Sequence, residues 1–212
     1  MSMILTVDPC SPDPASLDRA AETLQQGGIL AYPTETLYGL GVDPFREDAL
    51  DRLFRLKGRS TGTPVSVLVR DMEMLQDLVE DVPPRARLVL ERFLPGPLTA
   101  VLFARGRLPS RLTGGTGKIG VRISPHPVLS YLFERFPHPL TTTSANRTGM
   151  APAVNAGQVR DAFPEGIDCI LDAGPAPGGT GSTVADLTGR DPLILREGAL
   201  SRQELFGFLQ GT

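Results

Sequence analysis

The sequence predicts an α/β protein in which helices flank a twisted mixed sheet. Along all 212 residues, segments with apolar residues at helical spacing alternate with short apolar runs typical of buried strands. Some links between these runs are too short for a parallel crossover, so parallel and antiparallel pairs are both expected. The length and the 41% content of hydrophobic residues suffice for one core, and we expect a single domain over residues 1–212.

The first predicted elements lead to a polar loop. A helix is expected over residues 13–26, because apolar residues recur at helical spacing and Pro14 suits the first turn. The apolar run 29–32 indicates a buried strand, which ends at Pro33. It delivers the loop 34–36 at its carboxyl end, and this loop is a candidate site.

The remaining elements follow from the same two patterns. Further helices are predicted over 47–56, 72–79, 84–93, 127–135, 156–163 and 201–209. Further strands are predicted over 65–69, 98–103, 119–123, 139–143, 169–172, 183–187 and 193–196. The loop 172–182 is rich in glycine and proline, and we expect it to be a mobile element between two strands.

Composition excludes several classes of protein. A net charge of −3 and an isoelectric point near 5.4 give no overall attraction for nucleic acid or anionic membranes. The two cysteines and two histidines show neither disulfide nor metal-ligand spacing, so no protein metal site is expected. No apolar run approaches the roughly 20 residues that span a bilayer. The amino terminus also lacks a secretory signal pattern, and we expect a cytoplasmic protein with no membrane partner.

Three familiar motifs fail. Residues 115–120 match G-x-G-x-x-G, but a strand-like stretch follows, not a helix whose amino end could bind pyrophosphate. The same region fails as a P-loop, because Leu112 replaces the first glycine and Ile119 replaces the magnesium-binding hydroxyl. Ser144 has no evident general base in the sequence, so covalent catalysis is not expected. Any nucleotide must be bound in another way.

Four short segments carry polar groups suited to anionic substrates. They are residues 33–41 (PTETLYGLG), 57–59 (KGR), 142–146 (TTSAN) and 181–183 (GST), the last together with Arg196. Together they resemble the YrdC family of threonylcarbamoyl-AMP synthases, whose hallmark is a K-x-R pair combined with a distant S-x-N. The resemblance runs from about residue 27 to residue 196. It implies a YrdC-like sheet flanked by helices, with a concave basic active-site surface.

The resemblance implies a nucleotidyltransferase that synthesises L-threonylcarbamoyladenylate. In the family, the amine of L-threonine takes up bicarbonate, and the resulting carbamate attacks the α-phosphate of ATP with Mg²⁺ assisting and pyrophosphate leaving. Clustered cations and hydroxyls suit this chemistry, because two anions must meet and developing charge must be stabilised. The chain resembles the short form of the family, so separate threonylcarbamoyl-transferase proteins are expected to modify tRNA with the product.

The resemblance assigns the catalytic and ATP-binding roles to five residues. Lys57 and Arg59 would grip the phosphates, while Ser144 and Asn146 would donate hydrogen bonds to phosphoryl or carbamoyl oxygens. These four are the predicted catalytic residues, and Lys57, Arg59, Ser144 and Arg196 are the predicted ATP-binding residues. Alternatively, Lys57 and Arg59 are solvated charges at a helix end, and Arg196 pairs with a neighbouring acid.

The resemblance also assigns an amino-acid pocket. Arg122 matches the family arginine that clamps the threonine carboxylate, where a bidentate fork suits a planar anion. Thr34, Thr142 and Ser182 match positions whose hydroxyls recognise threonine. The alternative is that Arg122 is a surface strand residue and that each hydroxyl belongs to a turn or a sheet.

Smaller features of these segments carry further expectations. Tyr38, Gly39 and Gly41 are expected to shape a loop, in which the glycines permit backbone conformations closed to other residues. Two residues depart from the family pattern. Ser60 stands where proline is common, and Leu68 stands near where longer members have histidine.

Other functions stay open at this point. One alternative is an RNA-binding module with a concave basic surface, although the acidic isoelectric point favours at most weak RNA binding. Another is the carbamoyl-adenylate-handling module of hydrogenase maturation, which normally belongs to a much larger chain with zinc fingers. An inactive paralogue is disfavoured, because K-x-R and S-A-N are both intact.

Overall fold

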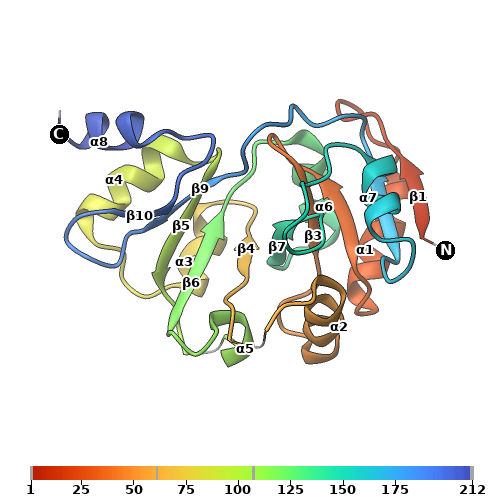
Figure 1. Ribbon diagram of the computed structural model, residues 1–212, viewed down its shortest axis with the longest axis horizontal. Helices are drawn as coiled ribbons and strands as arrows, with labels where there is room; N and C mark the ends of the chain where they lie inside the picture. The colour runs from red at the N-terminus through yellow and green to blue at the C-terminus, as the bar shows by residue number, and fades with distance from the viewer. Residues whose placement is uncertain (1, 61, 107, 211–212) are drawn as a thin grey trace.

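The computed structural model describes residues 2–60, 62–106 and 108–210. Its helices are α1 (Pro14–Gln25), α2 (Glu47–Lys57), α3 (Met72–Leu78), α4 (Pro84–Phe93), α5 (Ser110–Thr113), α6 (Pro127–Arg135), α7 (Ala156–Ala162) and α8 (Arg202–Gln210). Its strands are β1 (Met3–Thr6), β2 (Leu30–Pro33), β3 (Tyr38–Gly41), β4 (Ser66–Leu68), β5 (Leu98–Phe103), β6 (Lys118–Arg122), β7 (Leu140–Ser144), β8 (Cys169–Asp172), β9 (Thr183–Asp186) and β10 (Leu193–Arg196). The predicted α/β class is confirmed (Figure 1).

In the described part of the chain the strands form one ten-stranded sheet, in the order β1-β8-β2-β3-β7-β4-β6-β5-β9-β10. Four neighbouring pairs are parallel: β1–β8, β2–β8, β4–β6 and β5–β9. The other pairs are antiparallel, among them the hairpin β2–β3, whose short link allows no parallel crossover. The prediction of a mixed sheet is therefore confirmed.

Two hydrophobic clusters cover the sheet. On one face, α1 and α6 pack against β2, β7 and β8. On the other face, helices α2, α3, α4, α7 and α8 share a larger cluster with most of the strands. Strand β2 serves both clusters, since successive side chains point to opposite faces and place Tyr32 in the first cluster and Ala31 in the second. On the first face, β5, β6 and β9 carry polar side chains beyond α1 and α6, and a cavity forms there.

Most predicted elements are confirmed to within one residue at each end. Helices α4 and α6 and strands β5, β8 and β10 have the predicted bounds. Three elements were missed. Strand β1 is a short edge strand, α5 is a single turn of four residues, and β3 contains two glycines, which have low strand propensity.

The two glycines of β3 have a different structural role from the one predicted. Residues 38–41 form a strand, and neither Gly39 nor Gly41 has a positive φ angle. Instead, a Cβ on Gly39 would lie 2.9 Å from the ring of Tyr32, and a Cβ on Gly41 would lie 2.6 Å from both the Leu140 side chain and the Thr141 carbonyl oxygen. The expectation of special loop conformations was wrong, because these glycines permit close packing.

The segment between β8 and β9 crosses the molecule along the upper edge of Figure 1. Its backbone is tied to other elements at three points. The Tyr38 hydroxyl donates to the Gly174 carbonyl at 2.7 Å, and the amides of Ala176 and Gly178 donate to Val154 and Thr36 at 2.8 and 2.9 Å. The predicted mobility of this loop stays a prediction. Among the described residues, no helix has both the length and the apolar composition needed to cross a bilayer.

Replacing Gly41 tests the close approach of β3 to β7. We expect Gly41→Ala to lower the free energy of unfolding by about 1–3 kcal/mol, because the added methyl group overpacks the contact with Leu140. Gly207→Ala is the matched control: a Cβ there meets nothing within 4 Å, inside helix α8. It should raise stability by about 0.5–1 kcal/mol. Denaturant unfolding measures both changes, and an unaltered stability of Gly41→Ala would contradict the packing argument.

Candidate active site

A cavity of about 650 Å³ opens on the polar part of the sheet. Its walls come from β3, β4, β5, β6, β7, β9 and β10, and from residues 179–182 of the crossing segment. Of the nine predicted site residues, eight line this cavity. They are Thr34, Arg59, Arg122, Thr142, Ser144, Asn146, Ser182 and Arg196.

Strand register explains why segments distant in the sequence meet here. Residues directly opposite each other on paired strands point to the same face of a sheet. Ser66 of β4 pairs with Thr142 of β7, and Gly39 of β3 pairs with Ser144 of β7. Arg122 of β6 pairs with Leu68 of β4, two residues beyond Ser66 and therefore on the same face. Leu68, one of the departures from the family pattern, is fully buried and belongs to the hydrophobic cluster of α1 and α6 on this face.

Arg59 reaches the cavity because helix α2 ends abruptly. Gly58 adopts the left-handed conformation with φ of 63°, and the amide of Arg59 donates back to the Phe54 carbonyl at 3.0 Å. Within the described residues the Arg59 guanidinium forms no hydrogen bond or ion pair, although it lines the cavity. Burial and the nearby Arg196 lower the pKa of Arg59. Two neighbouring guanidinium groups with little protein counter-charge form a site for an anion.

Lys57 lies behind the cavity wall. It is only 5% exposed, and its ammonium donates to the carbonyl oxygens of Ser144 and Asn146 at 2.6 and 2.5 Å. A third bond reaches the Asn146 side-chain oxygen at 3.2 Å. Burial, with a smaller contribution from Arg59, lowers the pKa of Lys57 to about 8. The alternative that Lys57 is a solvated charge at a helix end was wrong, since its side chain is buried in the last turn of α2.

Ser144 and Asn146 form one bonded unit with Lys57. The Ser144 hydroxyl donates to Asn146 Oδ1 at 2.6 Å, and Asn146 Nδ2 donates to the Met150 carbonyl. Lys57 therefore holds the shape of the segment that presents Ser144 and Asn146 to the cavity. This lysine is not itself among the residues that line it.

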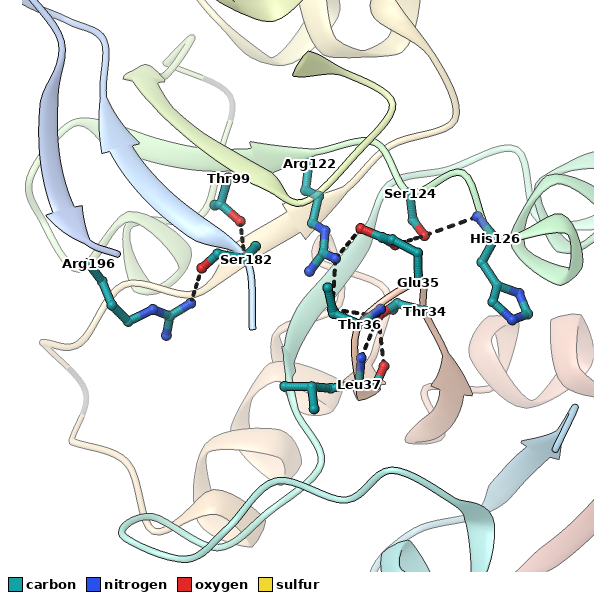
Figure 2. A network of polar contacts seen from close by, with 10 residues as sticks. All are labelled: Thr34, Glu35, Thr36, Leu37, Thr99, Arg122, Ser124, His126, Ser182 and Arg196. Atoms are coloured by element: carbon teal, nitrogen blue, oxygen red, sulfur yellow. Dashed lines mark hydrogen bonds and ion pairs between the residues drawn. The ribbon is translucent and has the colours of Figure 1, made fainter. Parts of the chain in front are cut away.

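Arg122 is the most buried of the three arginines that line the cavity. Its side chain is 8% exposed, and one terminal nitrogen donates to the Glu35 carboxylate and, at 3.0 Å, to the Thr36 hydroxyl (Figure 2). The Nε atom of Arg122 is buried and has no hydrogen-bond partner among the described residues. Arg122 is thus held from one side while it lines the cavity on another.

The three predicted hydroxyls differ in the hydrogen bonds that they already form within the protein. Thr34 caps the β2–β3 turn: its hydroxyl donates to the Leu37 carbonyl at 2.7 Å and accepts from the Leu37 amide at 3.1 Å. The Ser182 hydroxyl shares a 2.8 Å bond with Thr99, and its carbonyl accepts from Arg196 at 3.0 Å. Thr142 also lines the cavity, and its side chain forms a hydrogen bond with the Tyr32 side chain.

Glu35 and Thr36 were predicted only as part of the candidate loop 34–36, with no role of their own, and Thr99 was not predicted as a site residue at all. Glu35 and Thr36 lie inside the quoted PTET segment, so an acid flanked by two threonines was the available signal. Thr99 had no such signal, because it enters the cavity only through the pairing of β5 with its neighbours. Local sequence identifies a polar residue, but the sheet decides which polar residues meet.

Comparison with known proteins agrees with this geometry. The family model Sua5_yciO_yrdC, described as telomere recombination, matches residues 22–198. A threonylcarbamoyl-AMP synthase of Nitrosococcus oceani is 39% identical over 172 residues, which cover 81% of this chain and 90% of that protein. One from Pyrococcus abyssi is 37% identical over 186 residues, which cover 88% of this chain and 55% of that protein.

A solved structure also superposes closely. The crystal structure of P. abyssi Sua5 complexed with L-threonine aligns with a TM-score of 0.93 at 34% identity, covering 98% of this chain and 61% of that one. The chain therefore spans little more than half of the P. abyssi protein but most of the N. oceani protein. Fold, cavity and sequence similarity agree, and the chain belongs to the Sua5/YciO/YrdC family.

Proposed function

We propose that this chain synthesises L-threonylcarbamoyladenylate from L-threonine, bicarbonate and ATP, with release of pyrophosphate. One observation carries the proposal: a single cavity presents two separate anion sites. Arg59 and Arg196 suit a polyphosphate, whereas Arg122 among hydroxyls suits the carboxylate of an amino acid. The names of the relatives, threonylcarbamoyl-AMP synthase, support the same reaction.

The chemistry requires two bond-forming steps in one place. The threonine amine forms a C–N bond with bicarbonate as water leaves, and a carbamate oxygen then attacks the α-phosphorus of ATP. The bond from the α-phosphorus to the bridging oxygen breaks, and pyrophosphate departs with the electron pair. The protein holds the two anions together and stabilises the charge that develops, so positioning and electrostatics supply the catalysis.

The side chains divide this work. Arg59 and Arg196 contact the phosphates, because their guanidinium groups face the cavity with little counter-charge from the protein. Ser144 and Asn146 present polar groups to the phosphoryl and carbamoyl oxygens, and Lys57 keeps their segment in shape from behind. Lys57 thus adds positive charge to the ATP site without lining it.

Magnesium fits as the metal complex of the ATP substrate. The described residues hold no cluster of three or more His, Cys, Asp or Glu, and Glu197 is the one carboxylate among the described cavity residues. Mg²⁺ usually keeps several waters and binds substrate phosphates with one or two carboxylates, so this donor set suits a metal that arrives with the triphosphate. When bound, it would neutralise phosphate charge, and Glu197 would be the cavity carboxylate that contacts it.

The product is a mixed anhydride that needs an acceptor. We propose that separate transferase proteins consume it to make threonylcarbamoyladenosine in tRNA. The RNA-binding alternative and the carbamoyl-paralogue alternative predict different assay results. The first predicts salt-sensitive RNA binding without ATP consumption, and the second predicts adenylate formation that does not need threonine.

The decisive test is ATP-to-pyrophosphate conversion with magnesium and bicarbonate, with and without threonine. We expect threonine-dependent release, with threonylcarbamoyl-AMP detected by mass spectrometry. Arg59→Ala should reduce kcat/KM for ATP about ten- to a hundredfold, because a hydrogen bond to a charged group contributes about 1.5–3 kcal/mol. Arg87→Ala, on the exposed side of α4, should behave as wild type. Absence of threonine dependence would refute the proposed reaction.

Replacing Arg122 separates the two anion sites. We expect Arg122→Ala to raise the Michaelis constant for threonine by about tenfold or more, with a smaller change in that for ATP, because it removes the proposed carboxylate donor. Steady-state kinetics with each substrate varied in turn give both constants. A larger effect on ATP than on threonine would mean that the two subsites are assigned the wrong way round.

The lowered pKa of Lys57 predicts a pH dependence of nucleotide binding. Phosphate binding favours the protonated ammonium, so affinity should be full below the pKa of about 8 and should weaken as the pH rises through it. Titration of a non-hydrolysable ATP analogue between about pH 7 and about pH 9.5 measures this without interference from the threonine amine. Lys57→Met should bind the ATP analogue weakly and should not lose affinity as the pH rises, whereas Arg87→Ala should show the same loss of affinity at high pH as wild type. A flat wild-type profile would contradict the prediction.

A further inference from the structure

Glu35 occupies an unusual place beside the cavity. Both neighbours in its turn, Thr34 and Thr36, line the cavity, but Glu35 does not. Its two carboxylate oxygens point instead to residues of the β6 end: one accepts from Arg122 and the other from the Ser124 hydroxyl (Figure 2). Glu35 is therefore connected to the cavity through its contact with Arg122, which lines it.

The turn that carries Glu35 is itself rigid. The Thr34 hydroxyl accepts from the amides of Thr36 and Leu37 at 3.2 and 3.1 Å and donates to the Leu37 carbonyl at 2.7 Å. A turn closed by three bonds from one side chain fixes the direction in which Glu35 leaves it. The direction of Glu35 is therefore set by the turn and not only by its contact with Arg122.

The contact also joins parts of the sheet that are not neighbours. Strands β7 and β4 lie between β3 and β6 in the strand order. Glu35, in the turn before β3, reaches over both of them to Arg122 at the end of β6 and to Ser124 just beyond it. The Ser124 hydroxyl in turn accepts from the His126 amide at 3.3 Å, which continues the contact to the start of α6.

Burial makes this carboxylate necessary. The Arg122 side chain is 8% exposed and that of Glu35 is 19% exposed, so neither charge is well hydrated. A buried arginine without a counter-ion would turn toward water and lose the direction of its fork. Arg122 is paired with Glu35 and Thr36 through one terminal nitrogen, which leaves its other terminal nitrogen for a ligand, while its buried Nε has no partner among the described residues.

We propose that Glu35 is a positioning residue of the amino-acid subsite, which holds Arg122 in the orientation that accepts the carboxylate of an α-amino acid. This inference rests on the proposed function. Glu35 supplies alignment and charge balance, and Arg122 makes the contact with the substrate. Glu35 thus contributes to selection of the amino acid but not to binding of ATP.

Variants of Glu35 test this by the substrate they affect. We expect Glu35→Ala to raise the Michaelis constant for threonine about tenfold or more and to leave that for ATP within about twofold. Glu35→Gln, which keeps one oxygen acceptor but no charge, should lie between Glu35→Ala and wild type. Asp186→Ala is the matched control: Asp186 is 16% exposed and pairs with Lys118 at the other end of β6, and it should leave both constants unchanged.

A second measurement does not depend on turnover. The Nε–H signal of Arg122 in a ¹H–¹⁵N spectrum, assigned by its loss in Arg122→Lys, should exchange slowly with water in wild type and much faster in Glu35→Ala. An Arg122 signal that Glu35→Ala leaves unchanged would overturn the positioning role, whether or not the enzyme is active. If the wild type shows no threonine-dependent pyrophosphate release, the proposed function fails.

If the wild type is active, two kinetic results in Glu35→Ala would overturn the inference. One is an unchanged or lowered Michaelis constant for threonine, and the other is an equal rise in the Michaelis constants for threonine and ATP.

Discussion

The cavity depends on the central strand β7. This strand pairs with β3 on one side and with β4 on the other, so it joins the two halves of the sheet. The pairing is tight, because only a glycine at position 41 leaves room for Leu140 and Thr141 of β7. A shift of one residue would turn Thr142 and Ser144 to the opposite face, since side chains alternate along a strand. The register of β7 therefore decides whether the site exists.

The charged residues of the site fall into two physical classes. Lys57 and Arg122 are buried and already bonded, one to backbone carbonyls and the other to Glu35. Arg59 and Arg196 face the cavity, and within the described residues neither is paired with a carboxylate. A buried charge is stable only with partners, whereas an unpaired one at a cavity surface attracts an anion. The first class shapes the walls, and the second provides the attraction.

The crossing segment between β8 and β9 connects these parts. It is tied to the β2–β3 turn through the Gly178 amide and to β3 through the Tyr38 hydroxyl, and it then delivers Ser182 to the cavity. The two ends of the site are thus linked through backbone bonds as well as through the Glu35–Arg122 pair. Displacement of the turn that carries Thr34 would affect both the Arg122 side and the Ser182 side of the cavity.

The sequence by itself determined every helix except the single-turn α5, most strands, the mixed sheet and the segments that build the site, because each depends on local spacing or on a short motif. Tertiary structure alone decided that residues 38–41 pair as a strand, that Lys57 lies behind the wall, and that Glu35 meets Arg122. These features arise from contacts between residues far apart in the chain. Strand order, register and burial set such contacts, and no local pattern encodes them.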